Sequence, residues 1–348
     1  MMLGKDNLAL DSQDMLGKVG SLPEQLESGI EGASAVWSTA QWPEPNLLVV
    51  AGMGGSAIGG EILKSYLAKD GKTPIVVRRG YTLPGYVGPG SVVVVSSYSG
   101  NTAEALSCFE MALERKVRVA CITSGGELMA RARKMSIPLV ELPSGYPPRA
   151  AVGHSFAALL ALAWELGLRR ADRAGLEDCA DELRRLRGVY SVPDSSENTA
   201  MFVAKSLVHL TPVFYCASEL KAVVLRWKNQ ICENSKKMAY TGLLPEMSHN
   251  DIMGWEVPEA SLRAGVIFLR AAGEHPRVSA RFPLIREIIG DRASFCGEYW
   301  GSGASLLSRL FSLILLGDYA SVYLALLRGL DPTPIATIDG MKTKLERT

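Results

Sequence analysis

The sequence has few of the residues that build metal centres or disulfide frameworks. Among its 348 residues are four histidines and six cysteines. The histidines form no HxxH or HxH spacing and the cysteines no CxxC pair, so no metal site is expected. The same scatter argues against disulfides, and we expect the cysteines to be reduced core residues. They are Cys108, Cys121, Cys179, Cys216, Cys232 and Cys296.

An excess of charge of one sign is also lacking. The chain has 37 Lys and Arg against 36 Asp and Glu, a formal charge of +1. Basic residues cluster only in short pairs such as Arg78-Arg79, so we expect a small-molecule partner and no nucleic acid. The first 15 residues mix Lys and Asp with no apolar stretch, unlike a secretory signal, which predicts a cytoplasmic protein.

Long uninterrupted hydrophobic runs are missing too. The run Phe156–Leu168 is too short to span a bilayer, and Leu310–Leu327 carries Gly317 and Asp318 in its middle. Both runs therefore predict buried helices, and no membrane partner is expected.

Apolar residues are abundant at 47%, enough for packed cores, and the length favours two domains. We expect an N-terminal helical segment over 1–45, a first domain over 46–168, a connecting segment over 169–204 and a second domain over 205–348. The Pro/Gly/Ser stretch 143–148 marks a boundary loop, followed by a long apolar helix over Arg149–Leu168. The polar segment Asp172–Asn198 predicts a solvated connecting helix and a turn.

The first half alternates short buried strands with amphipathic helices, the rhythm of a doubly wound α/β domain. Strands are predicted at Leu47–Ala51, Ile75–Val77, Val92–Ser96, Val117–Ile122 and Pro138–Leu142, and helices at Ala57–Ala68, Thr102–Arg115 and Glu127–Met135. The second half echoes this pattern with strands at Val213–Cys216 and Val266–Arg270 and helices at Glu219–Tyr240, Arg277–Gly290 and Gly303–Gly329. The fold class is therefore α/β, with two doubly wound domains whose parallel sheets are flanked by helices. The second half lacks a glycine-rich loop, so one ligand site is expected, formed mainly by the first domain.

The glycine-rich loop over residues 52–57 joins a predicted strand to a predicted helix. Such a loop directs backbone N–H groups and a helix dipole at an anion, so it predicts a phosphate site. Gly52, Gly54 and Ala57 also satisfy a dinucleotide fingerprint, G-x-G-x-x-A. The next strand, however, ends in Arg78-Arg79 rather than in an acid for a ribose hydroxyl, which disfavours the nucleotide.

A second loop, Ser-Ser-Tyr-Ser-Gly-Asn-Thr over 96–102, follows the third predicted strand. By itself such a cluster is a capping turn as often as it is a binding loop. Because ligands of open α/β sheets lie beyond the carboxyl ends of the strands, however, the two loops can face each other across a crevice. Their hydroxyl and N–H groups suit a phosphate monoester.

Three further residues are candidates for chemistry. Arg149 follows two prolines on a stiff loop, Glu233 lies on a mixed helical face, and His249 sits in a polar loop. A partly buried Glu233 would suit a general base. The plainer interpretations are a surface arginine, a solvated carboxylate and a structural histidine. The sequence Gly153-His154-Ser155 is not a nucleophile elbow, because two prolines precede it where a strand is required, and a hydrolase is not expected.

Several ordered motifs together resemble the bifunctional phosphoglucose/phosphomannose isomerases of the sugar-isomerase (SIS) superfamily. The similarity runs from Leu10 to Lys342 and includes GMGGSAIGG, SSYSGNT, PPRA, ENSK and SHND. It implies two SIS-type domains and isomerisation of glucose 6-phosphate, and of mannose 6-phosphate, with fructose 6-phosphate through a cis-enediol, without a cofactor. The family often has Asn-His-Asn-Glu where this chain has Ser248-His249-Asn250-Asp251.

The resemblance also implies residue roles. Catalytic roles fall on Arg149 beside the reacting carbons, Glu233 as base, His249 for ring opening, and Lys342. Phosphate-binding roles fall on Gly55, Ser56, Ser97, Ser99 and Thr102. Thr333 or Thr337 is a candidate for shaping the space around C2.

The expected assembly is a homodimer with shared active sites, in which His249 is donated across the interface and the apolar helix over Leu310–Leu327 supplies interface surface. Four alternatives stay open: an isomerase for glucose 6-phosphate alone, an isomerase for a different sugar phosphate, a non-catalytic sugar-phosphate-binding protein, and a nucleotide-dependent oxidoreductase.

Overall fold

Two parallel β-sheets form the framework, and the computed structural model describes residues 3–257 and 263–345. Sheet A has five strands in the order β2-β1-β3-β4-β5, and sheet B has four in the order β7-β6-β8-β9. Every paired strand runs parallel to its neighbour. The strands are β1 Leu47–Ala51, β2 Ile75–Arg78, β3 Ser91–Ser96, β4 Arg118–Thr123, β5 Leu139–Glu141, β6 Thr211–Ala217, β7 Tyr240–Leu244, β8 Ala264–Arg270 and β9 Phe295–Trp300.

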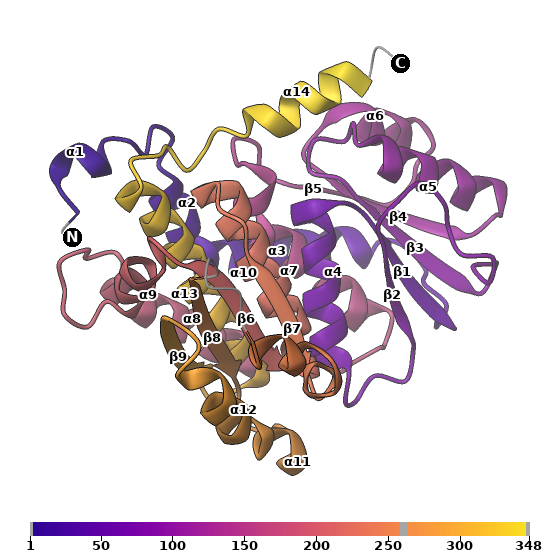
Figure 1. The fold of residues 1–348 in the computed structure, drawn as a ribbon. Coiled ribbons are helices and arrows are strands. Elements are labelled where there is room, and N and C mark those ends of the chain that lie inside the picture. Colours follow the sequence, from indigo (N-terminus) through magenta and orange to yellow (C-terminus); the bar gives the residue numbers. More distant parts are fainter. Residues whose placement is uncertain (1–2, 258–262, 346–348) are drawn as a thin grey trace.

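Helices cover both sheets, and Figure 1 shows a group of them between the two. The helices are α1 Lys5–Leu8, α2 Met15–Gly20, α3 Leu22–Trp37, α4 Gly54–Leu67, α5 Ala103–Glu114, α6 Gly126–Lys134, α7 Val152–Glu165, α8 Arg173–Tyr190, α9 Thr199–Leu207, α10 Lys221–Ser235, α11 Pro276–Ser279, α12 Arg281–Gly290, α13 Leu306–Leu327 and α14 Ala336–Leu345. Four short 3-10 helices are η1 Pro148–Ala150, η2 Ser218–Leu220, η3 Glu246–His249 and η4 Asp251–Trp255. This arrangement confirms the predicted α/β class with two helix-flanked parallel sheets.

Alternation along the strands divides the interior into layers, because successive side chains point to opposite faces of a sheet. In β1, Val49 joins a cluster with Phe109 of α5, whereas Val50 joins the central cluster with Ile62 of α4 and Phe156 of α7. Sheet B contributes its own inner face to that central cluster, and its outer face packs against α12. The central helices, among them α4, α7, α10 and α13, are thus held between the two sheets.

Helix α13 lies wholly inside the protein. Among the described residues it is the one helix long and apolar enough to cross a membrane, and its apolar window is completely buried within the chain. The expectation that Leu310–Leu327 supplies surface for a subunit interface is therefore wrong, because this helix already fills the core. The expectation that Phe156–Leu168 and Leu310–Leu327 are buried is confirmed.

The second half contains two strands and two helices that the sequence did not predict. The predicted helix Glu219–Tyr240 instead ends at Ser235, where Lys236 adopts a left-handed conformation with φ of 50°. Tyr240 opens strand β7 instead. Strand β9 is only partly buried and so lacks the apolar run of an interior strand, and α9 and α14 were also missed.

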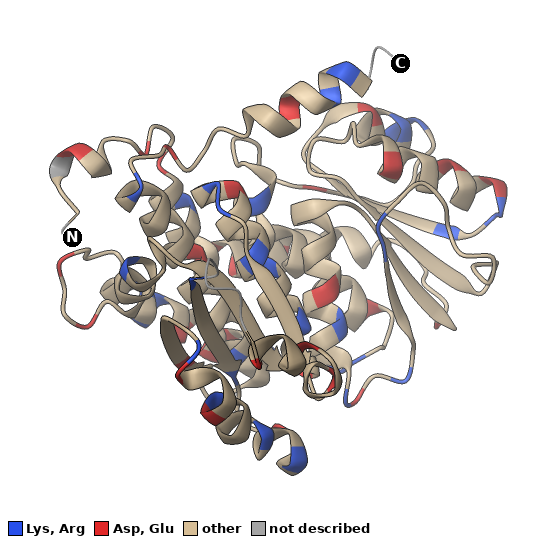
Figure 2. Cartoon of the chain, in the orientation of Figure 1, with Lys and Arg blue, Asp and Glu red and all other residues tan. Residues whose placement is uncertain are grey.

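Two smaller expectations need correction. The predicted continuous helix over Arg149–Leu168 is a 3-10 turn at Pro148–Ala150 followed by α7 from Val152. The cysteines are free, but Cys232 is exposed rather than part of the core. Charged residues of both signs are spread over the elements visible in Figure 2, in keeping with the balanced composition.

Candidate active site between the two sheets

The carboxyl ends of β1 and β3 form the centre of the site. These strands are neighbours in sheet A, with β2 outside one and β4 outside the other. The chain order reverses between them, which is the position where open α/β sheets bind ligands. Helices α4 and α5 start just beyond these strand ends, and neither has a side-chain cap hydrogen bond. The free N–H groups of two helix starts therefore favour an anion here.

Hydroxyl groups from the two predicted loops meet at this edge. The Tyr98 backbone N–H donates to Ser56 Oγ over 3.1 Å, which ties the second loop to the first. Ser97 Oγ donates to Thr102 Oγ1 over 2.9 Å. Ser99 is exposed, and its Oγ accepts from the Asn101 N–H over 3.3 Å. The structure thus brings the predicted serines and threonine together across the two loops.

Gly55 connects this edge to the turn that carries Arg149. A Cβ atom at Gly55 would lie 2.7 Å from the Pro148 carbonyl oxygen and 3.0 Å from the Arg149 nitrogen. Only a glycine allows the two backbones to approach so closely. Arg149 is consequently placed beside the first turn of α4.

Arg149 meets Glu233 of the second half of the chain. The Arg149 side chain is 3% exposed, and its Nη1 lies 3.7 Å from Glu233 Oε2. Burial lowers the pKa of Arg149, and the Glu233 carboxylate opposes this shift. The guanidinium nevertheless stays cationic at neutral pH. The Glu233 side chain is 25% exposed, so a carboxylate beside a fixed cation remains open to a ligand.

The segment 331–333 is bound by two cations. Arg149 Nη2 donates to the carbonyl oxygens of Pro332 and Thr333, each over 2.9 Å. Lys236 Nζ donates to the carbonyl oxygens of Asp331 and Pro332, each over 3.0 Å. Burial lowers the pKa of Lys236, and the neighbouring Arg149 charge adds to this effect. Lys236 was not assigned a role from sequence, although it stands in the ENSK motif.

Thr333 is the last residue of this segment and lies in the site, whereas Thr337 is exposed on α14. Among the described residues, the buried Thr333 Oγ1 has no hydrogen-bond partner. A buried hydroxyl without a partner suits a polar ligand group. Of the two threonines suggested for the space around C2, only Thr333 therefore adjoins Arg149.

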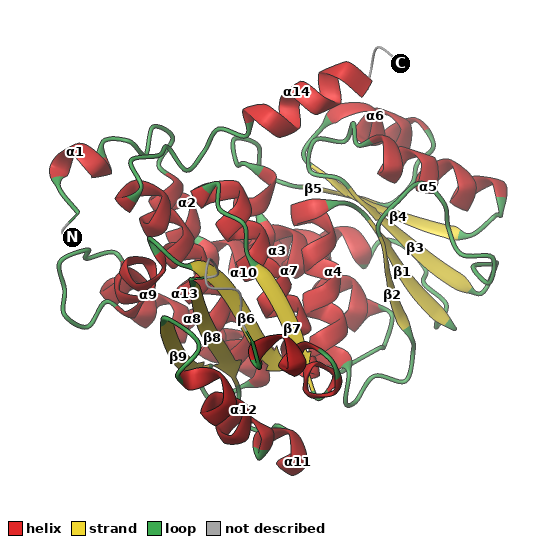
Figure 3. Cartoon of the chain, in the orientation of Figure 1, coloured by secondary structure: helices red, strands yellow, loops and turns green. Residues whose placement is uncertain are grey.

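His249 and Lys342 stand apart from this cluster within the chain. Glu233 lies near the carboxyl end of α10, just before the amino end of β7. His249 ends η3, which follows the carboxyl end of β7. The arrows of β6 and β7 in Figure 3 point towards the foot of the view, and β7 alone spans about 16 Å. His249 is thus at the opposite edge of sheet B from Glu233. Lys342 is exposed on α14, a helix with no buried residue.

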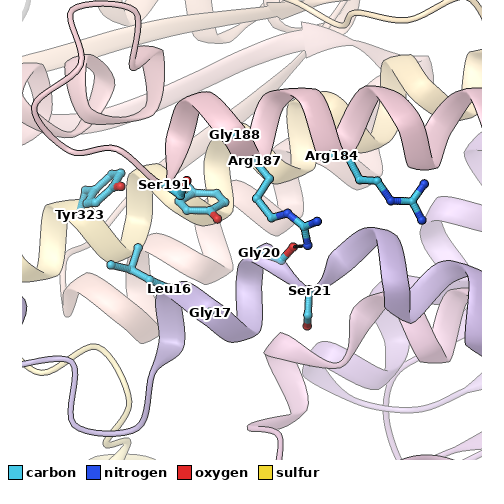
Figure 4. A pocket seen from close by; sticks show the side chains of 10 residues that line it. Leu16, Gly17, Gly20, Ser21, Arg184, Arg187, Gly188, Ser191 and Tyr323 are labelled. Atoms are coloured by element: carbon cyan, nitrogen blue, oxygen red, sulfur yellow. Dashed lines mark hydrogen bonds between the residues drawn. The ribbon is translucent and has the colours of Figure 1, made fainter.

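A separate cavity of about 600 Å³ lies between α2, α8 and α13 (Figure 4). Its arginines are engaged by carboxylates, since Arg187 lies 2.8 Å from Glu24 and Arg184 pairs with Glu27. None of the predicted site residues lines it. The lining residues are Leu16, Gly17, Gly20, Ser21, Arg184, Arg187, Gly188, Ser191, Tyr319 and Tyr323.

Metal ligands are not gathered in the described part of the chain. Residues 3–257 and 263–345 contain no group of three or more His, Cys, Asp or Glu that could hold an ion. The buried histidine, His154, packs edge-on against the Tyr146 ring at 5.6 Å. Burial lowers its pKa to about 4, so it is neutral at physiological pH.

Comparisons with known proteins cover both halves of the chain. A family model described as SIS domain matches residues 44–163, and one described as bacterial phospho-glucose isomerase C-terminal SIS domain matches residues 196–345. A bifunctional phosphoglucose/phosphomannose isomerase of Caldicellulosiruptor bescii is 38% identical over 95% of this chain and 98% of its own. The Aquifex aeolicus protein of the same name is 36% identical over 86% of this chain and 90% of its own.

The fold also matches solved structures. A hypothetical protein of Thermus thermophilus superposes with a TM-score of 0.76 at 17% identity, covering 99% of this chain and 94% of its own. At that identity the match supports the fold alone.

Proposed function

We propose, since the chain belongs to the bifunctional phosphoglucose/phosphomannose isomerase family, that it interconverts glucose 6-phosphate and mannose 6-phosphate with fructose 6-phosphate. The protein is a sugar-phosphate aldose–ketose isomerase. The site assignment rests on one observation. Arg149 and Glu233 lie close together beside the two hydroxyl-rich loops. The proposal assigns residues 46–168 and 205–348 to the two SIS-type domains and places the enzyme in the cytoplasm.

The two loops at the carboxyl ends of β1 and β3 hold the phosphate of the substrate in this proposal. Ser56, Ser97, Ser99 and Thr102 supply hydroxyls, and the starts of α4 and α5 supply N–H groups. The Gly55 N–H stands at the first turn of α4. Binding the phosphate away from the reacting carbons positions C1 and C2 without changing their chemistry.

Proton transfer between C1 and C2 is assigned to Glu233. The carboxylate removes a proton from one carbon of the open-chain sugar and returns it to the other, through a cis-enediolate. Arg149 Nη1 faces Glu233 and donates no hydrogen bond to another described residue, so it is free to stabilise the enediolate oxygens. The buried Thr333 Oγ1 is proposed to contact the sugar near C2.

Ring opening requires a second acid–base group, which we assign to His249 of a partner subunit. Within one chain His249 and Glu233 lie at opposite edges of sheet B, which supports a symmetric dimer in which His249 of one subunit reaches Glu233 of the other. Lys342, on the exposed helix α14, is proposed to assist ring opening. The change from Glu to Asp at Asp251 shortens a side chain next to this loop.

One alternative loses support from the same geometry. A sugar-phosphate-binding protein without activity has no need for a carboxylate held 3.7 Å from a buried arginine. Other aldose 6-phosphates present the same two carbons, C1 and C2, so substrate identity is left to the assays.

The proposed function is tested by coupled assays that offer glucose 6-phosphate and mannose 6-phosphate separately. Both are expected to yield fructose 6-phosphate, and both activities are expected to survive dialysis against a strong chelator. Activity on glucose 6-phosphate alone would remove the mannose half of the proposal, and activity on neither would refute it.

The phosphate assignment predicts weaker substrate binding in Ser56→Ala and Thr102→Ala. Each variant loses a hydrogen bond to a dianion, so KM for fructose 6-phosphate should rise about 10-fold or more, with a smaller change in kcat. Ser107→Ala is a suitable control, because its hydroxyl lies on α5 but donates to the Tyr81 carbonyl oxygen, away from the loops. Unchanged KM in both loop variants would show that the loops bind something else.

A further inference from the structure

Asn234 holds the Arg149 guanidinium from the second half of the chain. Arg149 Nε donates to Asn234 Oδ1 over 2.6 Å. Asn234 Nδ2 in turn donates to Ser321 Oγ of α13 over 2.9 Å, and Ser321 Oγ donates to the Asp318 carbonyl oxygen over 2.7 Å. Because the serine proton is committed to a carbonyl, its oxygen can only accept, and the orientation of the carboxamide is fixed.

The main chain of Arg149 is fixed by the same two helices. Arg226 Nη2 of α10 donates to the Arg149 carbonyl oxygen over 2.9 Å. Arg226 also forms a buried ion pair with Asp318 of α13, with 2.5 Å between Nη2 and Oδ2. The turn and the side chain of Arg149 are thus both bound by α10, and the two α10 residues that bind them are held in turn by α13.

These contacts leave one part of the guanidinium free. Nε is taken by Asn234, and Nη2 by the carbonyl oxygens of Pro332 and Thr333. Nη1 remains, and it is the atom that faces Glu233. A planar guanidinium bound at Nε and Nη2 cannot rotate without breaking these bonds, so Nη1 is directed at one point.

We propose that Asn234 is a positioning residue for the isomerase reaction, which aims Arg149 Nη1 at the oxygens of the enediolate beside Glu233. This inference rests on the proposed function. The hydrogen bonds of the Asn234 side chain go to Arg149 and Ser321 and not to the phosphate loops. Asn234 therefore affects the reaction at C1 and C2 through Arg149 and leaves phosphate binding unaffected.

The test compares Asn234→Ala with Ser235→Ala in the full-length protein. Both residues are fully buried at the end of α10, and each makes a hydrogen bond to Ser321, since Ser235 Oγ donates to the Ser321 carbonyl oxygen over 2.7 Å. Of the two side chains, only that of Asn234 bonds to Arg149. The pair therefore separates loss of a bond between helices from loss of the Arg149 contact.

Asn234→Ala is expected to lower kcat by about 10- to 100-fold, the effect of a small misplacement of a catalytic group. KM for fructose 6-phosphate should change by less than about threefold, because the phosphate loops are intact. Inhibition constants supply a second readout. They do not depend on how much of the enzyme is folded, because unfolded protein contributes no activity. The hydroxamate of 5-phosphoarabinonate, a planar analogue of the enediolate, should bind about 10-fold more weakly, whereas glucitol 6-phosphate should bind as before.

Ser235→Ala should leave kcat and both inhibition constants near the parent values. If Asn234→Ala does not fold, Asn234→Ser keeps a polar group in the site yet is too short to reach Nε, and the same result is expected. Equal behaviour of the Asn234 and Ser235 variants, or equal weakening of both inhibitors, would overturn the inference. A parent protein that isomerises neither aldose would instead refute the proposed function, and the inference with it.

Discussion

Replacing Glu233 with glutamine is expected to lower kcat for both aldoses by about 1,000-fold, because a positioned general base contributes a factor of this order. Glutamine keeps the shape of the side chain but cannot accept the carbon-bound proton. KM should change little, since the phosphate loops and three bonds of the Arg149 side chain are untouched.

Glu219→Gln supplies the matched control for this variant. Glu219 is exposed in η2, just before α10, at the end of the helix opposite Glu233. Its replacement should leave kcat near the parent value. Coupled assays at saturating substrate measure both variants, and a Glu233→Gln enzyme with more than about a tenth of parent kcat would contradict the assignment.

Mixing inactive Glu233→Gln and His249→Ala proteins after reversible dissociation is expected to restore activity. Random reassortment gives about half hybrid dimers, and one site of each hybrid has both native residues, so about a quarter of full activity should return. The reason is geometric: Glu233 and His249 of one chain lie at opposite edges of sheet B.

Subunit exchange has to be shown independently, for instance with two differently tagged variants. A mixture that exchanges subunits and stays inactive would mean that both residues come from one chain. In the proposed dimer the contact has to involve surface other than α13, because that helix is buried within the chain.

Much of sheet A could be predicted because its inner strands β1 and β3 are buried on both faces. The residues of β1 and β3 are all buried, and parallel strands of this kind appear in the sequence as short continuous apolar runs. The adjoining loops could be located for the same reason. Their contact with each other follows from the pairing of β1 with β3.

Other features depend on packing that no local pattern records. Arg149 and Glu233 are 84 positions apart (233 minus 149), and they meet because α10 is hydrogen-bonded to the turn at Pro148–Ala150. The partly buried strand β9 contains Gly297 and Glu298, so it has no apolar run to identify it. Asn234 stands in a recognised motif, but its contact with Arg149 could be seen only in the structure.

The most direct measurement of the central claim is the exchange of the C1 hydrogen of fructose 6-phosphate with deuterium from solvent, followed by proton NMR. The parent enzyme should incorporate deuterium at C1 and at C2 of the aldose products, because Glu233 exchanges its proton with water between the two transfers. Glu233→Gln should bind fructose 6-phosphate without exchange. Near-parental exchange by Glu233→Gln, or isomerisation by the parent with no deuterium incorporated, would contradict proton transfer by Glu233 through an enediolate.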